Sequence, residues 1–147
     1  MSPHSFREQI KSGRRNFKGI TLSDCNLTGL NLQNIDLSYA NLEAVDFHEA
    51  DLSGANLTGV TLFKVNMTGA NLQRATLNRA RLLSVRMEAT DLRQANFEMA
   101  CIMDTDLNDA NLWGAILPDG ELYGATLTMR AAFVMLQTAE DGFLEST

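Results

Sequence analysis

A five-residue period runs through most of this chain and limits the folds that it can adopt. From Phe17 to Leu127, every fifth residue is Leu, Phe, Met or Ile, and the register holds through 23 consecutive positions. On an α-helix, steps of five residues would spread these side chains around the whole surface, and on a flat strand they would alternate between two faces. They all stay on one side only if the chain turns a corner in each repeat. Four right-angle corners then close one coil every twenty residues.

The residues around each central apolar position support a coil that is filled from within. Two places before the central residue stands a second apolar or small residue, such as Cys25, Val45 or Ala55. Directly before it stands Asn, Asp or Thr in 16 of the 19 repeats from Thr21 to Asn111. Short polar side chains hydrogen-bond to nearby backbone, which suits a corner outside regular ladders. Because these residues recur in every coil, we interpret them as structural and not as a catalytic site.

Residues 50–54 (ADLSG), 55–59 (ANLTG) and 70–74 (ANLQR) show the repeat most clearly. These segments resemble the A(D/N)LXX repeats of the pentapeptide-repeat family, and the resemblance covers residues 16–128. It implies that family's fold, an all-β solenoid in the form of a right-handed quadrilateral β-helix. The 23 repeats would make about six coils, and at ~4.8 Å per coil the column would be about 28 Å long.

An open coil exposes its last apolar residues and its unpaired edge, so each end of the column needs a cap. At the front, residues 5–8 (SFRE) form a capping-box pattern, Phe6 and Ile10 fall on one helical face, and Gly13 supplies a stop. The segment 1–15 is therefore predicted to hold a short helix over the first coil. Residues 12–17 also resemble, more weakly, the lead-in of small cyanobacterial family members.

The C-terminal segment 129–147 is predicted to begin with a second short helix, from residue 129 to about residue 139. Phe133 and Leu136 belong to one apolar stripe at helical spacing, which is enough to plug the last coil, whereas Val134 and Met135 lie off that stripe and are a surplus. Three roles stay open for this segment. It caps the coil, covers an apolar surface of the column, or contacts a second copy.

One outward row departs from the small polar residues that the repeat prefers. The position after the central residue on one wall carries large apolar side chains at twenty-residue spacing, namely Phe63, Leu83, Met103 and Tyr123, and Met99 lies around the same corner. Stacked on one wall, they would form a patch of a few hundred Å², a size at which contact with a partner is a reasonable hypothesis. The alternative is that a terminal segment folds over the stripe.

Charge is unevenly distributed within the formal net charge of −6. Residues 73–94 carry a basic belt between two acidic zones, made of Arg74, Arg79, Arg81, Arg86 and Arg93. In the stacking register Arg86 lies above Asp106 and Arg93 above Trp113, which predicts local pairing and, for the second pair, a cation–π contact. The belt is interpreted either as a candidate site or as a surface mosaic that keeps the column soluble.

The two cysteines do not fit a disulfide. Cys25 and Cys101 would lie nearly four coils apart, about 18 Å along the axis, whereas a disulfide needs Cα atoms within about 7 Å. Cys25 falls on an inward position and Cys101 on an outward one. With no signal-peptide pattern at the N-terminus, we expect reduced thiols and a cytoplasmic location.

No enzymatic constellation is found in the sequence. GxSxG, HExxH, P-loop and helix-opening GxGxxG patterns are absent, and His4 and His48 have no matching ligand set. A straight column also lacks the concave pocket that small-molecule sites usually need. We therefore predict a protein that is not an enzyme and that uses no cofactor, no metal and no small-molecule substrate.

Two functions from different classes remain. The first is a protein-interaction scaffold that binds a protein partner or a homodimer partner through its outer wall. The second is mimicry of nucleic acid, because gyrase-protecting members of the similar family act as dimers whose acidic rods resemble duplex DNA. The acidic C-terminal third fits that alternative, whereas the arginines do not. Direct binding of nucleic acid is not expected at this net charge, and no run of 18 apolar residues predicts a membrane span.

Overall fold

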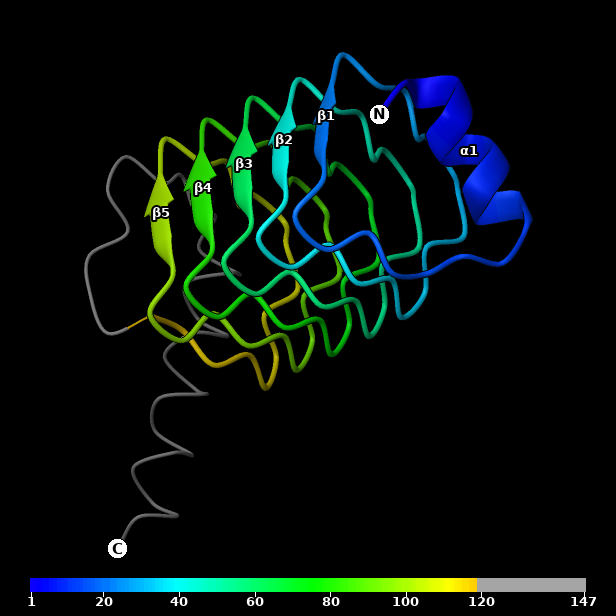
Figure 1. Cartoon of the computed structure of the whole chain (residues 1–147). Coiled ribbons are helices and arrows are strands. Elements are labelled where there is room, and N and C mark those ends of the chain that lie inside the picture. Colours follow the sequence, from blue (N-terminus) through cyan, green and yellow to red (C-terminus); the bar gives the residue numbers. More distant parts are fainter. Residues whose placement is uncertain (119–147) are drawn as a thin grey trace, which may run out of the picture.

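The computed structural model describes residues 1–118, which form a column of stacked coils with one helix at its N-terminal end (Figure 1). The helix α1 spans Pro3–Lys11. Five strands of three residues follow, which are β1 (Thr21–Ser23), β2 (Asn41–Glu43), β3 (Thr61–Phe63), β4 (Arg81–Leu83) and β5 (Cys101–Met103). They pair in parallel and in sequence order. A parallel sheet whose neighbours follow one another along the chain confirms the predicted all-β solenoid.

The register between coils is twenty residues on every side of the column. Leu42 pairs with Leu62 in the sheet, and Leu62 with Leu82. Isolated parallel bridges repeat the same step on the other three sides, as between Asn31 and Asp51. The column is thus four-sided. We name its sides the strand wall (β1–β5), and the second, third and fourth walls, whose bridges begin at residues 26, 31 and 16 respectively.

The core is a single stack of inward side chains. Every central residue from Phe17 to Leu112 is buried, and so are most of the residues two places before them. Burying a leucine side chain contributes about 1.5–3 kcal/mol, so the regular stack provides the main driving force for folding. Thr90 is a polar residue in this stack, and its hydroxyl donates to the carbonyl oxygen of Met67 at 2.9 Å.

The corners explain the short polar residues and a repeated left-handed backbone. The side-chain oxygen of Asn26 accepts from the backbone N–H of Thr28 at 3.0 Å, and the same contact recurs along the chain. Fourteen non-glycine residues have positive φ, and all of them stand two places after a central residue. This backbone costs about 1–2 kcal/mol per residue. It lets the N–H of Ala44, for example, donate to the carbonyl of Phe63 in the next coil at 3.0 Å.

The N-terminal cap is present, but it begins earlier than the sequence pattern predicts. Ser2 is the N-cap residue, and its hydroxyl accepts from the backbone N–H of Ser5 at 3.1 Å. Pro3 follows at the first helical position, where its fixed φ favours an earlier start than the predicted cap at Ser5. Phe6 is buried, as expected, and its ring lies 4.6 Å from that of Phe17. The helix therefore covers the first coil.

The C-terminal expectations lie largely outside the described residues. The strands β1 to β5 mark four turns of twenty residues, and the bridges of the fourth wall, from Asn16 to Ile116, mark five. Both are fewer than the predicted six coils, the last of which runs to residue 128, whereas the description ends at 118. Tyr123 and the predicted cap with Phe133, Val134, Met135 and Leu136 fall beyond that point. Among residues 1–118, no helix is long and apolar enough to cross a membrane.

Candidate functional site

The strand wall carries a row of three large apolar side chains. Phe63, Leu83 and Met103 are consecutive register partners at the ends of β3, β4 and β5, and we call them the apolar ladder. They point outward because the preceding residue of each strand is buried in the core. Met103 is 39% exposed, and the other two are partly exposed. The twenty-residue spacing thus brings these three predicted residues into one row.

Polar groups surround Phe63, the N-terminal member of the apolar ladder. The Lys64 Nζ atom lies 5.0 Å from the centre of the Phe63 ring, in a cation–π contact. On the side of Phe63 toward β1 and β2, smaller side chains leave a shallow hollow of about 190 Å³. It is lined by Thr21, Ser23, Asn41, Leu42, Glu43, Thr61 and Phe63. The ladder and this hollow together form an uneven surface that combines apolar and polar groups.

The sulfur-bearing residues near the ladder differ in exposure. Met99 stands on the fourth wall, across the corner from β5, and is exposed. Cys101 begins β5 and is exposed as well, whereas Cys25 is buried and burial raises the pKa of its thiol. Both cysteines are free thiols. The predicted difference between an inward and an outward cysteine is confirmed.

The basic belt encircles the column and does not form one patch. Arg81 begins β4 on the strand wall, and Arg86 forms a bridge on the second wall. By the same twenty-residue register, Arg74 and Arg93 lie on the third wall and Arg79 on the fourth. The five guanidinium groups therefore face in four directions.

Two of these arginines pair with carboxylates in their own repeat. Arg86 stacks on Asp106 as predicted, but its Nε atom lies 3.5 Å from Glu88 Oε1. The predicted contact of Arg93 with Trp113 is wrong, because its guanidinium binds the Asp91 carboxylate at 2.7 Å. A charge-assisted hydrogen bond two residues away is stronger than a contact with an exposed ring. Within residues 1–118, Arg74, Arg79 and Arg81 have no ion pair.

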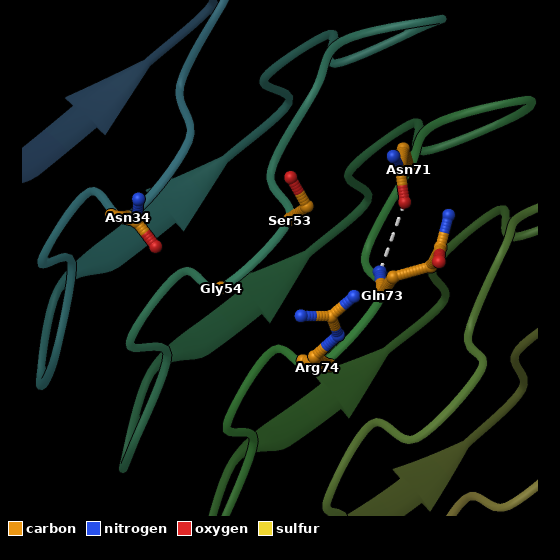
Figure 2. A pocket seen from close by; sticks show the side chains of 6 residues that line it. All are labelled: Asn34, Ser53, Gly54, Asn71, Gln73 and Arg74. Atoms are coloured by element: carbon orange, nitrogen blue, oxygen red, sulfur yellow. Dashed lines mark hydrogen bonds between the residues drawn. The ribbon is translucent and has the colours of Figure 1, made fainter.

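A larger hollow, of about 440 Å³, lies on the third wall (Figure 2). It is lined by Asn34, Ser53, Gly54, Asn71, Gln73 and Arg74. Asn34, Gly54 and Arg74 occupy the same corner position in three successive coils, and the glycine leaves room between the two polar side chains. A Cβ atom at Gly54 would clash with Asn34 Oδ1. Sequence reasoning missed this site, although a glycine between an asparagine and an arginine at twenty-residue spacing is its signal.

The family model for pentapeptide repeats matches residues 16–54, 40–79 and 70–109. The chain belongs to the pentapeptide-repeat family. This confirms the resemblance on which the expected fold rests. A comparison of this pentapeptide repeat protein with curated protein sequences found no match.

Solved structures show the same fold. Rfr23, a pentapeptide repeat protein from the cyanobacterium Cyanothece 51142, matches with a TM-score of 0.73 and 23% identity over 86% of this chain and 95% of that chain. A pentapeptide repeat protein from the thylakoid lumen of Arabidopsis thaliana matches with a TM-score of 0.53 and 25% identity over 65% and 70% of the two chains. QnrB1, a plasmid-mediated fluoroquinolone resistance protein, matches with a TM-score of 0.51 and 13% identity over 86% and 92%.

Proposed function

We propose that this pentapeptide repeat protein is a non-catalytic scaffold that binds a protein partner, or a second copy of itself, through the strand wall. The observation that carries the proposal is the row of Phe63, Leu83 and Met103 on a parallel sheet. Each of these strands is hydrogen-bonded to its neighbours, so the row is held in place before binding. A preorganised surface loses little conformational entropy when a partner docks.

The surroundings of the apolar ladder suit a protein surface. Interfaces commonly have an apolar centre and a polar, hydrated rim. Here Glu43 and Lys64 stand beside Phe63, and Arg81 lies next to Leu83 in β4 without an ion pair among the described residues. The small hollow above Phe63 offers space for one partner side chain. A partner with an apolar row and charges of both signs at its edge would match this wall.

The experiment replaces two rungs of the ladder in the full chain. Phe63→Glu with Leu83→Glu places two carboxylates on the wall, and we expect loss of self-association in sedimentation velocity or of the partner in a pull-down from the native source. The matched control is Trp113→Glu with Ile116→Glu, which adds the same charge at exposed apolar residues on other walls. Binding that survives the ladder variant, or that is lost equally in the control, would contradict the proposal.

Mimicry of DNA is the second candidate, because the net charge is −6 and the chain shares its fold with QnrB1, a fluoroquinolone resistance protein. A mimic needs negative charge along its whole length. The basic belt interrupts the acidic residues on all four walls, with Arg74, Arg79 and Arg81 unpaired within residues 1–118, and this favours the scaffold. A gyrase supercoiling assay separates the two. We expect no effect of the protein at micromolar concentration, and protection or inhibition of gyrase would favour the mimic.

A cytoplasmic location is part of the proposal. Cys25 and Cys101 are both free thiols, and a reducing compartment maintains that state. One relative of this fold comes from the thylakoid lumen of a plant, so the compartment needs a direct test. Fractionation of the native cells, followed by immunoblotting, should place the protein in the cytoplasmic fraction. Recovery from a lumenal or extracellular fraction would contradict this part of the proposal.

A further inference from the structure

The guanidinium of Arg74 faces the third-wall hollow without a countercharge. Figure 2 shows Arg74 on one side of Gly54 and Asn34 on the other, with the hollow between them. No hydrogen bond or ion pair engages the Arg74 side chain within residues 1–118. This wall is the one opposite the strand wall, so a ligand here would not contact the apolar ladder.

The two carboxylates of the same wall are already occupied. Asp51 accepts hydrogen bonds from the Ser53 hydroxyl at 2.7 Å and from the Gln33 carboxamide. Asp91 binds the Arg93 guanidinium through both of its oxygens. Neither carboxylate neutralises Arg74, although both lie in adjacent coils of the stack.

The other polar groups of the hollow add neutral hydrogen-bonding capacity. Asn71 Oδ1 accepts from the backbone N–H of Gln73 at 3.0 Å, which leaves the Asn71 amide nitrogen as a donor. The Asn34 carboxamide has no side-chain hydrogen bond within the described residues. Because a glycine separates Asn34 from Arg74, the carboxamides and the guanidinium border one open space of about 440 Å³. Asn34 Oδ1, an acceptor, is the atom that faces Gly54, so the Asn34 carboxamide donates into this space only after a half-turn about its last torsion, which breaks no hydrogen bond among the described residues.

We propose that the third-wall hollow binds a single carboxylate group, held by Arg74 and hydrogen-bonded by the carboxamides of Asn34 and Asn71. The planar guanidinium matches a carboxylate through two parallel hydrogen bonds. A singly charged group fits better than a phosphate dianion, because Asp51 and Asp91 on the same wall repel further negative charge. The volume exceeds that of a carboxylate alone, so the site admits the acidic side chain of a protein segment. A free small carboxylate shares this chemistry.

The other two unpaired arginines of the belt lack this combination. Arg79 shares a hollow of about 280 Å³ with Glu98, which supplies a competing carboxylate on the same wall. Arg81 lies on the strand wall and lines neither the third-wall hollow nor the hollow beside Arg79. Arg81 is therefore the matched control for Arg74, since both arginines lie on the surface, two repeats apart, and neither has an ion pair among the described residues.

The test is a titration of the full-length, ¹⁵N-labelled protein followed by heteronuclear NMR. The probes are an acetylated Gly-Gly-Glu-Gly-Gly amide peptide, the same peptide with Gln in place of Glu, sodium acetate and inorganic phosphate. We expect saturable shifts of the Gly54 and Arg74 amide signals with the Glu peptide and none with the Gln peptide. Arg74→Gln should weaken binding at least tenfold, Gly54→Ala should also weaken it, and Arg81→Gln should leave it unchanged.

The titrations with acetate and phosphate identify the source of the carboxylate, and the strand-wall variant distinguishes this site from the proposed interface. Acetate that saturates at the same concentration as the Glu peptide supports a site for free carboxylates, and a tighter peptide supports an acidic side chain. Equal loss with Arg74→Gln and Arg81→Gln, binding of the Gln peptide, or tighter binding of phosphate overturns the proposal. The Phe63→Glu, Leu83→Glu variant should retain peptide binding, so failure of the strand-wall interface and failure of this site are distinguishable.

Discussion

The corner between Tyr39 and Gly59 offers a quantitative test of how outward residues of successive coils constrain each other. Tyr39 (φ 60°) and Gly59 (φ 64°) occupy the same left-handed position in adjacent coils. A Cβ atom at Gly59 would lie 2.6 Å from both Cδ1 and Cε1 of the Tyr39 ring. At Gly29 the φ angle is 68°, and nothing lies within 4 Å of the same added atom. Gly29→Ala therefore tests the backbone alone, and Gly59→Ala tests the backbone together with the ring.

The two substitutions should differ in cost by about 1 kcal/mol. A left-handed alanine costs about 1–2 kcal/mol, part of which is offset because alanine has less entropy to lose on folding, so we expect Gly29→Ala to destabilise by about 1 kcal/mol. Gly59→Ala carries the same term and must also displace the Tyr39 ring, which is 56% exposed and free to turn outward. The displaced ring loses its contact with the Lys18 Nζ atom, which lies 5.5 Å from the ring centre and is worth about 0.5–1 kcal/mol. The expected total for Gly59→Ala is about 2 kcal/mol.

Urea unfolding followed by far-ultraviolet circular dichroism measures these free energies directly. A double-mutant cycle with Tyr39→Ala isolates the contribution of the ring. In the Tyr39→Ala background, Gly59→Ala should cost no more than Gly29→Ala does in the natural chain. Equal costs for the two glycines in the natural chain, or an additional cost at Gly59 that persists without the ring, would refute the reasoning.

Three further outcomes follow from the core, the thiols and one carboxylate. Leu62→Ala, in the fully buried stack, should lower the free energy of unfolding by about 2–5 kcal/mol in the same urea assay. Cys101 should react with Ellman's reagent in the folded protein, and Cys25 only in urea. Partial burial raises the pKa of Asp91, but hydrogen bonds from Arg93 outweigh it and hold this pKa below its ordinary value of 3.8. The unfolded chain therefore binds more protons near that pH, so the free energy of unfolding should fall as the pH drops below about 4. Asp91→Asn should reduce the dependence of this free energy on pH, measured by urea unfolding from pH 6 to pH 3.

The fold was predictable because one constraint repeats in every coil. An inward residue at every fifth position admits few structures, and the family resemblance selected one of them. The helix start at Ser2 was less predictable, because Ser2 and Ser5 both have cap chemistry and the competition between them depends on Pro3 and on where Phe6 meets Phe17. The sequence pattern alone does not predict which of the two serines caps the helix, since tertiary packing decides between them.

The candidate sites were predictable in position and less so in chemistry. The twenty-residue register of the sequence is sufficient by itself to place Phe63, Leu83 and Met103 in one row. The same register placed Arg93 over Trp113. The rotamer of a long charged side chain depends on the nearest countercharge, however, and Arg93 pairs with Asp91 in its own repeat. Backbone register is fixed by the core, whereas the contacts of exposed flexible side chains are set by weaker local energies.

The separation of core from surface has a consequence for how this column acquires binding sites. The inward residues fix the backbone regardless of what stands outside, so an outward residue is constrained mainly by its neighbours one coil above and below. A row of large side chains at twenty-residue spacing produces the apolar ladder, and a glycine between two polar residues at the same spacing produces the hollow beside Arg74. Two unlike surfaces can therefore exist on opposite walls without a compromise in the core. A scaffold that joins two partners needs such independence. We expect the strand-wall variant to lose the partner while it retains the peptide, and Arg74→Gln to weaken peptide binding while it retains the partner.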